Sequence, residues 1–154
     1  MPLDGWDHVE LWVGNAKQAA YFYEHAFGFR CTAYAGPETG VRDRASYVLE
    51  QGEIRLVFTS GLRRDSPICE FALMHGDGVK DISLRVPDAT NAYREAVQRG
   101  ARGVAEPHWV EDEFGKVELS SIATYGDVVH TFVNRAGYEG AYLPGYVAQE
   151  WTNG

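Results

Sequence analysis

Two stretches of the sequence, residues 7–20 and 80–93, repeat the same order of apolar and polar residues. They read DHVELWVGNAKQAA and KDISLRVPDATNAY. Aligned without gaps, they place apolar residues at matching positions: Val9 with Ile82, Leu11 with Leu84, Val13 with Val86, Ala16 with Ala89, and Ala19 with Ala92. Internal repetition of this kind requires that both copies form the same small unit of structure. A fold built from two equivalent modules is therefore the main constraint on this chain.

Each copy begins as a strand and continues as a helix. In residues 8–13 apolar and polar residues alternate, which predicts a strand with one apolar face. Asn15 and Asp88 then stand where a helix N-cap belongs. Gly28 and Gly100 follow the two helical patterns, at the position where a left-handed residue commonly ends a helix. Both copies therefore predict a β-strand followed by an α-helix.

Three strand-like runs follow each predicted helix, separated by turn signals. They cover residues 29–35, 43–51 and 53–60 in the first copy, and 102–110, 116–123 and 127–134 in the second. The sequence thus predicts an α+β fold in which residues 1–154 form one domain. It contains two βαβββ modules (6–60 and 78–134), a linker (61–77) with a short helix at 67–75, and a tail (135–154).

The polar side of the first strand in each module carries the candidate site residues. If the apolar positions face the helices, six residues point to a concave side of the sheets: His8, Glu10, Trp12, Asp81, Ser83 and Arg85. A polar lining of a concave face suits a small-molecule site, and His8, Glu10, Asp81 and Arg85 are the candidates for it. The same lining is equally compatible with a solvated face or with a surface that binds a partner.

Charge and cysteine content exclude several classes of function. The net charge is −8, without a basic stripe, which argues against binding to nucleic acid or to an anionic membrane. The first residues have neither the basic nor the apolar region of a signal peptide, and no apolar stretch is long enough to span a bilayer. Cys31 and Cys69 lack the spacing of a metal or redox motif and are expected to be buried free thiols. We expect a soluble cytoplasmic protein.

Paired βαβββ modules resemble the vicinal oxygen chelate superfamily, which includes glyoxalase I and extradiol dioxygenases. Within it the chain resembles the first domain of the 4-hydroxyphenylpyruvate dioxygenase family. The matching segments run in family order along nearly the whole chain. They are residues 12–20 (WVGNAKQAA), 34–40 (YAGPETG), 75–82 (HGDGVKDI), 106–107 (EP), 112–116 (DEFGK), 123–127 (ATYGD), 130–131 (HT) and 143–146 (LPGY).

The resemblance implies an enzyme that converts 4-hydroxyphenylpyruvate, a 2-oxo acid, and O₂ to homogentisate and CO₂ in tyrosine catabolism. Its cofactor would be non-haem Fe(II), held by two His and one Glu with positions left open for substrate and O₂. In the family these ligands lie in a second, carboxy-terminal domain. We therefore expect a homo-oligomeric full-length enzyme, and a 154-residue chain that has no catalytic residues and is inactive by itself.

The resemblance also identifies the places where this domain would hold a metal of its own. The family's ligands lie on the first strand of each module and on the last strand of the second, positions occupied here by His8, Asp81 and Thr131. Asp and Thr replace a His and the Glu, so we expect vestigial positions and no metal in this chain. The neighbouring His130 should point to the opposite face and form a hydrogen bond within the sheet.

Two other interpretations remain open on the sequence. One is a standalone vicinal oxygen chelate protein, either a small metalloenzyme or a small-molecule-binding module. The other is the related hydroxymandelate synthase, which shares substrate, cofactor and fold with the dioxygenase. The dioxygenase is preferred because the segments HGDGVKD, TYGD and LPGY together look closer to it.

Overall fold

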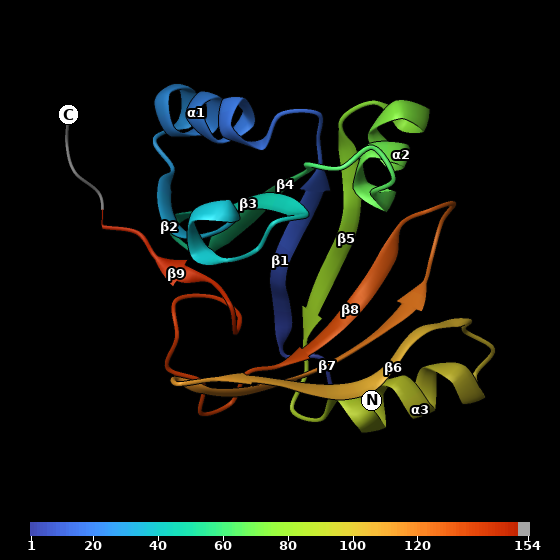
Figure 1. Cartoon of the computed structure of the whole chain (residues 1–154). Coiled ribbons are helices and arrows are strands. Elements are labelled where there is room, and N and C mark those ends of the chain that lie inside the picture. The colour runs from blue at the N-terminus through green and yellow to red at the C-terminus, as the bar shows by residue number, and fades with distance from the viewer. Residues whose placement is uncertain (151–154) are drawn as a thin grey trace. The chain divides into compact units, whose positions relative to one another are not determined.

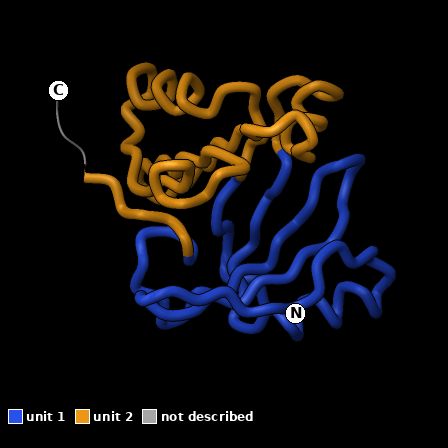
Figure 2. The backbone as a smooth tube through the Cα atoms, viewed as in Figure 1, with its two compact units in different colours: residues 1–9, 80–144 blue, residues 10–79, 145–154 orange. Residues whose placement is uncertain are grey.

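The structure, a computed structural model, describes residues 1–150; the last four residues of the predicted tail, 151–154, lie outside the described part. The chain forms two compact units (Figure 2). Unit 1 contains residues 1–9 and 80–144, and unit 2 contains residues 10–79 and the chain from Gly145 onward. The first strand therefore begins in unit 1 and ends in unit 2, and the tail passes from unit 1 to unit 2 after Pro144.

The order of elements confirms the predicted pair of βαβββ arrangements (Figure 1). The first consists of β1 (Gly5–Trp12), α1 (Ala16–Phe27), β2 (Arg30–Ala35), β3 (Arg44–Gln51) and β4 (Ile54–Gly61). The second consists of β5 (Gly78–Arg85), α3 (Ala89–Gln98), β6 (Gly103–Asp112), β7 (Gly115–Ala123) and β8 (Val129–Asn134). The predicted linker helix is α2 (Pro67–His75). Two short elements were not predicted: the 3₁₀ helix η1 (Pro37–Thr39) and the strand β9 (Val147–Ala148).

In unit 2, α1 packs against strands of a sheet in which β4, β3, β2 and β9 are successive neighbours. Strands β3 and β4 pair antiparallel from Arg44 opposite Gly61 to Gln51 opposite Ile54. The core consists of small residues of α1 and larger apolar residues of the strands or of positions next to them: Val13, Ala16, Ala20, Phe29, Leu49 and Phe58. Small residues on α1 allow the helix to lie close to the sheet.

In unit 1, α3 packs against strands of a sheet ordered β6, β7, β8 and β5. Strands β5 and β8 are parallel, with Asp81 opposite Val129 and Leu84 opposite Phe132. The core beneath α3 consists of Val86, Ala89, Ala92, Ala96 and Phe132.

The two cores are built from equivalent residues, and this confirms the repeat. Val13 and Val86 have the same role, as do Ala16 and Ala89, and all four are buried. After the first strand of each arrangement, the amide of the valine donates to a carbonyl of the last strand, at 2.9 Å in one unit and 3.0 Å in the other. Four of the five matching pairs therefore lie in the two cores or pack against them: Leu11 and Leu84, Val13 and Val86, Ala16 and Ala89, and Ala19 and Ala92.

The predicted helix ends are confirmed. The Asn15 side chain accepts from the amide of Gln18 at 3.0 Å, and the Asp88 side chain accepts from the amide of Asn91 at 2.7 Å. Gly28 ends α1 with φ of +77°, and α3 ends at Arg99 with Gly100 next, at φ of +103°. Both glycines thus occupy left-handed backbone, which other residues adopt at a cost.

Replacing Asn15 by Ala is expected to lower the free energy of unfolding by about 1 kcal/mol, since the amide of Gln18 loses its acceptor. Urea unfolding followed by circular dichroism measures the effect. Asn15→Asp is the matched control, because it keeps an acceptor oxygen at the start of the helix, and it should unfold near the parent midpoint. Equal losses in both variants would contradict the assigned cap.

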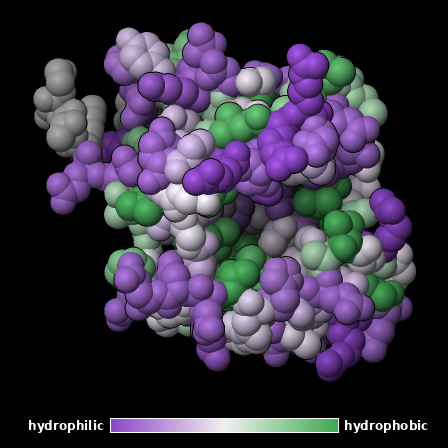
Figure 3. All heavy atoms as spheres, in the orientation of Figure 1, coloured by the Kyte–Doolittle hydropathy of each residue, from purple (hydrophilic) through white to green (hydrophobic). Residues whose placement is uncertain are grey.

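The surface mixes polar and apolar residues. On the face shown in Figure 3, hydrophobic residues appear in small groups among hydrophilic ones. Several large apolar side chains of α1 are more than half exposed, including those of Tyr21, Phe22 and Phe27. Within residues 1–150, none of the helices combines the length and the apolar character that a membrane span requires.

Candidate functional site

The three positions that correspond to metal ligands, His8, Asp81 and Thr131, all lie in unit 1, on β1, β5 and β8. His8 and Asp81 are buried, with 6 % and 8 % of their surface exposed. The Asp81 carboxylate accepts from the Thr131 hydroxyl at 2.5 Å and from the Thr131 amide at 3.1 Å. Asp81 and Thr131 are thus joined directly across neighbouring strands.

Ser83 connects this pair to His8. Its hydroxyl donates to Oδ1 of Asp81 at 3.0 Å and lies 3.1 Å from Nε2 of His8. Ser83 is fully buried. The sequence placed Ser83 on the polar side of its strand but gave no reason to single it out as the residue between the other two.

On its other side, the His8 ring is held by the carboxylate of Asp7. Nδ1 of His8 lies 2.6 Å from Oδ2 of Asp7, and the guanidinium of Arg135 donates to both Asp7 oxygens, at 2.7 Å and 2.8 Å. The Asp7 side chain is fully buried, and Arg135 is the first residue of the tail. Two parallel bonds from an arginine to a carboxylate form one of the stronger polar contacts in proteins.

Burial of Asp7 by itself raises the pKa of its carboxyl group, because the charged form loses water. Hydrogen bonds from His8 and Arg135, with the positive charge of Arg135, outweigh this and hold the pKa of Asp7 well below its usual range. Asp7 is therefore a buried carboxylate that remains ionised because His8 and Arg135 hydrogen-bond to it.

Asp7, His8 and Ser83 have the residue types and order of contacts of a hydrolase catalytic triad. The resemblance ends at Ser83. A nucleophilic hydroxyl must be accessible to substrate and passes its proton to the histidine, whereas Ser83 is fully buried and lies between His8 and a second carboxylate, Asp81. The side chains form a buried hydrogen-bonded network, and we assign Ser83 no nucleophilic role.

The tail also contacts this hydrogen-bonded network of side chains. Arg135 donates to the carbonyl oxygen of Tyr142 and lies over the Tyr142 ring, with 5.6 Å between the guanidinium carbon and the ring centroid. The same ring meets the His8 ring edge-on, at a centroid distance of 5.1 Å. Tyr142 is 2 % exposed. The part of the tail from Arg135 to Tyr142 therefore packs within unit 1.

Of the remaining two candidates, Glu10 takes no part in these hydrogen bonds, whereas Arg85 lies beside the Asp7 carboxylate. Glu10 belongs to unit 2, where it accepts from the Thr59 hydroxyl at 2.7 Å. Arg85 belongs to unit 1; its side chain is 46 % exposed, with Nε 3.7 Å from Oδ1 of Asp7. That the four candidates line a common cleft stays a prediction.

In unit 2 the contact to Glu10 extends to the tail through two further hydroxyl groups. The hydroxyls of Thr59 and Ser46 are 2.7 Å apart, and the Ser46 hydroxyl is 2.8 Å from that of Tyr146. Since Thr59 gives its proton to Glu10, Ser46 must donate to Thr59, and its oxygen then accepts from Tyr146. Burial, and next the negative charge of Glu10, raise the pKa of Tyr146 above its usual range, so its hydroxyl keeps its proton.

Sequence reasoning missed most of these partners. Arg135 is 128 residues from Asp7, and Tyr146 is 100 residues from Ser46. Between Tyr138 and Trp151 the sequence is rich in Tyr, Gly and Leu, a composition typical of a segment that packs against another surface, but it does not identify the partners. Prediction succeeded for His130, whose Nδ1 lies 2.8 Å from the carbonyl oxygen of Ile82 in the neighbouring strand.

The residues at the three ligand positions do not fit a ferrous centre of two His and one Glu. Thr131 supplies no carboxylate, and both oxygens of Asp81 already accept hydrogen bonds from Thr131 and Ser83. In the described part of the chain, no three His, Cys, Asp or Glu residues gather in a way that could hold a metal ion. We therefore derive no catalytic step from a metal in this chain.

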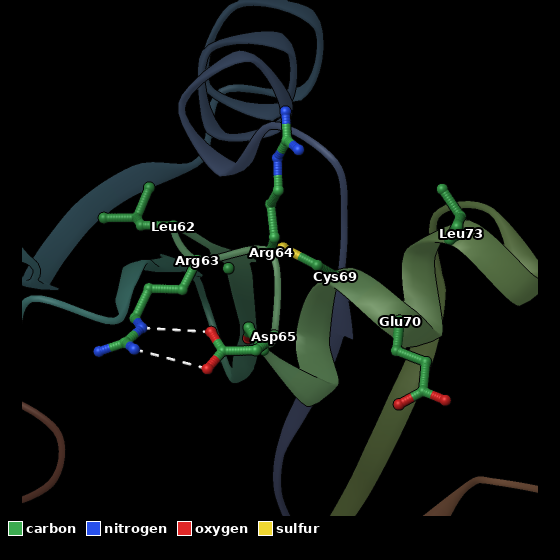
Figure 4. A pocket seen from close by; sticks show the side chains of 9 residues that line it. Leu62, Arg63, Arg64, Asp65, Cys69, Glu70 and Leu73 are labelled. Atoms are coloured by element: carbon green, nitrogen blue, oxygen red, sulfur yellow. Dashed lines mark hydrogen bonds and ion pairs between the residues drawn. The ribbon is translucent and has the colours of Figure 1, made fainter.

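Unit 2 also has a surface cavity, of about 550 Å³, between residues 61–66 and α2. Figure 4 shows Arg63 and Asp65 pointing toward each other, with contacts of 3.2 Å and 3.4 Å, while Arg64 and Glu70 point elsewhere. Exposed ion pairs of this kind contribute little, and the lining does not converge on a common point. We assign it no function.

Superposition on solved structures defines the class of protein to which the fold belongs. An epimerase of methylmalonyl-CoA from Mycobacterium tuberculosis superposes with a TM-score of 0.70 at 20 % identity, covering 86 % of this chain and 88 % of that one. A mutant of 4-hydroxymandelate synthase from Streptomyces coelicolor superposes with a TM-score of 0.87 at 30 % identity, covering 100 % of this chain and 44 % of that one. The chain has the vicinal oxygen chelate, or glyoxalase-like, fold.

Within that class, residues 1–143 match the family described as hydroxyphenylpyruvate dioxygenase, N-terminal. The chain belongs to this family. It is 49 % identical over 146 residues to the 4-hydroxyphenylpyruvate dioxygenase of Dictyostelium discoideum, and 44 % identical over 147 residues to that of Yarrowia lipolytica. These alignments cover 94 % and 93 % of this chain but only 40 % and 37 % of the two relatives. The chain is thus homologous to the amino-terminal portion of these dioxygenases.

Proposed function

We propose that the chain is the amino-terminal domain of an enzyme that converts 4-hydroxyphenylpyruvate and O₂ to homogentisate and CO₂. The observation that carries the proposal is the 49 % identity to a 4-hydroxyphenylpyruvate dioxygenase over 94 % of the chain. The identity to the 4-hydroxymandelate synthase is 30 %, which favours the dioxygenase over the synthase.

The catalytic iron would lie in the part of the protein that corresponds to the rest of the relatives' length. A ferrous centre of that kind supplies the electrons and the open coordination positions for a 2-oxo acid and O₂. In this domain, the hydrogen bonds among His8, Ser83, Asp81 and Thr131 support a structural role for the ligand positions. Scaffolding and contacts between subunits of a homo-oligomer would be its contribution.

A reducing, cytoplasmic location is part of the proposal. Cys31 and Cys69 are free thiols, half-buried instead of buried as expected. Burial, and next the charge of Glu24, raise the pKa of the Cys31 thiol to about 11, so it stays protonated and unreactive at neutral pH.

The purified 154-residue chain, incubated with Fe(II), ascorbate, O₂ and 4-hydroxyphenylpyruvate, is expected to form no homogentisate. Joined to the carboxy-terminal part of the Dictyostelium discoideum relative, it is expected to form homogentisate with matched consumption of O₂. Liquid chromatography of the products and an oxygen electrode measure both reactions. Turnover by the chain alone would contradict the proposal, as would a soluble, iron-loaded chimera without turnover.

Two further measurements separate this proposal from its alternatives. Metal analysis of the purified chain tests the standalone metalloprotein: one metal per chain, lost in His8→Ala, would favour that function. The coding sequence after codon 154 tests the larger enzyme. An open frame with two more βαβββ arrangements and His, His and Glu at their ligand positions is expected, and a stop codon would favour a standalone protein.

A further inference from the structure

The tail carries two tyrosines that are held in different ways. Tyr142 is almost fully buried in unit 1, where its ring contacts the His8 ring and the Arg135 guanidinium. Tyr146 lies in unit 2, where its hydroxyl meets that of Ser46. A segment that only connects two parts of a chain runs over the surface and buries few side chains. Two anchored tyrosines, four residues apart, indicate that this segment is docked.

The contacts in unit 1 converge on Arg135. Its guanidinium is paired with the buried Asp7 carboxylate and also donates to the carbonyl oxygen of Tyr142. One side chain thus closes the loop from the end of β8 to Tyr142. Within this loop the amide of Glu139 donates to the carbonyl oxygen of Phe114 at 3.1 Å, so this amide reports whether the loop is closed.

The contacts in unit 2 form a line of hydroxyl groups that ends on a carboxylate. Tyr146 donates to Ser46, Ser46 to Thr59, and Thr59 to Glu10, each step between 2.7 and 2.8 Å. Hydrogen bonds in such a line polarise one another, and a charged acceptor at the end strengthens them. Beyond Tyr146, β9 pairs with β2, and the amide of Gln149 donates to the carbonyl oxygen of Thr32 at 2.9 Å.

A change of backbone direction separates the two sets of contacts. Pro144 and Gly145 stand between the tyrosines, and Gly145 has φ of +95°, a conformation that favours glycine. None of the hydrogen bonds described above for one anchor shares a side chain with the other. Both sets nevertheless end on carboxylates of the same strand, Asp7 and Glu10 of β1.

We propose that β1 presents two independent docking sites for the tail, Asp7 for the loop closed by Arg135 and Tyr142, and Glu10 for the Tyr146 hydroxyl. Each end of the tail then opens and closes without the other. The inference goes beyond the proposed function and does not depend on it, since it requires neither iron nor substrate. A failure of the dioxygenase assignment would leave it unchanged.

Hydrogen–deuterium exchange of the full 154-residue chain tests the Glu10 site through Tyr146→Phe, which removes one hydroxyl and keeps the ring. The exchange rate of the Gln149 amide is expected to rise about fivefold, because a net hydrogen bond is lost locally, while that of Glu139 stays within twofold. Tyr125→Phe is the matched control, because Tyr125 is 86 % exposed, and it should change neither amide.

Arg135→Gln tests the Asp7 site and should give the opposite pattern. The Glu139 amide is expected to exchange at least ~10-fold faster, since the buried Asp7 carboxylate loses its main partner, while the Gln149 amide changes by less than twofold. Arg99→Gln is the control for removing an arginine, since Arg99 is paired with Glu95 on the surface. If Arg135→Gln fails to fold, Arg135→Lys keeps the charge without the two parallel bonds and should show the same asymmetry.

The asymmetry is the result that matters. Equal acceleration of both amides in either variant would overturn the proposal, because the tail would then open as one unit. Unchanged exchange of Gln149 in Tyr146→Phe, or of Glu139 in a folded Arg135 variant, would overturn it as well, because the corresponding site would not hold the tail.

Discussion

Replacing Asp7 by Asn is expected to lower the free energy of unfolding by about 3–5 kcal/mol, since it leaves the guanidinium of Arg135 without its carboxylate. Asn keeps nearly the shape of Asp, so the loss reflects charge and hydrogen bonds instead of volume. The Arg135 side chain is 17 % exposed and that of Asp7 is fully buried, so water replaces little of what is lost. Urea unfolding at pH 7 measures the effect.

The same variant should change how stability depends on pH. The pKa of Asp7 is lowered in the folded state, so its contribution is complete above the unfolded-state pKa of about 4 and is lost as the pH falls below that value. The difference in unfolding free energy between the parent and Asp7→Asn is therefore expected to be largest near neutral pH and to shrink toward pH 3. A difference that stays constant over this range would show that Asp7 is not held ionised by its partners.

A control for Asp7→Asn is available on the surface. Asp65 pairs with Arg63 in a similar geometry, but both side chains are more than 60 % exposed. Asp65→Asn should alter the stability by less than about 0.5 kcal/mol at every pH, because solvent screens exposed pairs. Equal effects at the two sites would mean that burial of Asp7 does not set the strength of its contacts.

Truncation of the two equivalent core phenylalanines is the second prediction with a large effect. Phe58→Ala and Phe132→Ala are each expected to lower the free energy of unfolding by about 3–5 kcal/mol, because each removes a large, fully buried side chain beneath its helix. Both residues are 1 % exposed, and each packs against the small residues of α1 or α3. Urea unfolding of the two variants measures the losses side by side.

The comparison also tests the repeat as a physical unit. If the two arrangements are equivalent, the two losses should agree within about 1.5 kcal/mol, since closely similar cavities open. Leu73→Ala, at a residue that is 92 % exposed, should change the stability by less than about 0.5 kcal/mol. A large loss in only one phenylalanine variant would indicate that the two cores do not contribute equally.

The elements of the fold could be predicted because their signals are local. Alternation at β1, the caps Asn15 and Asp88, and the glycines after α1 and α3 each act within a few residues. The two missed elements lack such signals. The strand β9 contains two residues and is defined by its pairing with β2. The helix η1 is a single turn in a segment that was interpreted only as a turn signal.

The sequence singled out some members of the hydrogen-bonded network in unit 1, and their role as a site stays a prediction. His8, Asp81 and Thr131 were selected by their positions within the repeat and the family resemblance, and in the structure they belong to one chain of hydrogen bonds. Their partner Ser83 could be placed on the polar side of β5, but the sequence did not indicate that it connects His8 to Asp81. Asp7 was passed over altogether, since its importance depends on Arg135, far along the chain.

By itself the sequence determined the two-module plan, the ends of the helices, and the family. These follow from periodicity and capping, which act between residues a few positions apart, and from the repetition of such local patterns in the two modules. Only the tertiary structure decided that a buried, ionised Asp7 is paired with the tail, and that hydroxyls from separate strands line up between Tyr146 and Glu10. The sequence does not show whether a polar side chain contacts water or another polar side chain. Its partners depend on how segments that are distant in the sequence pack together.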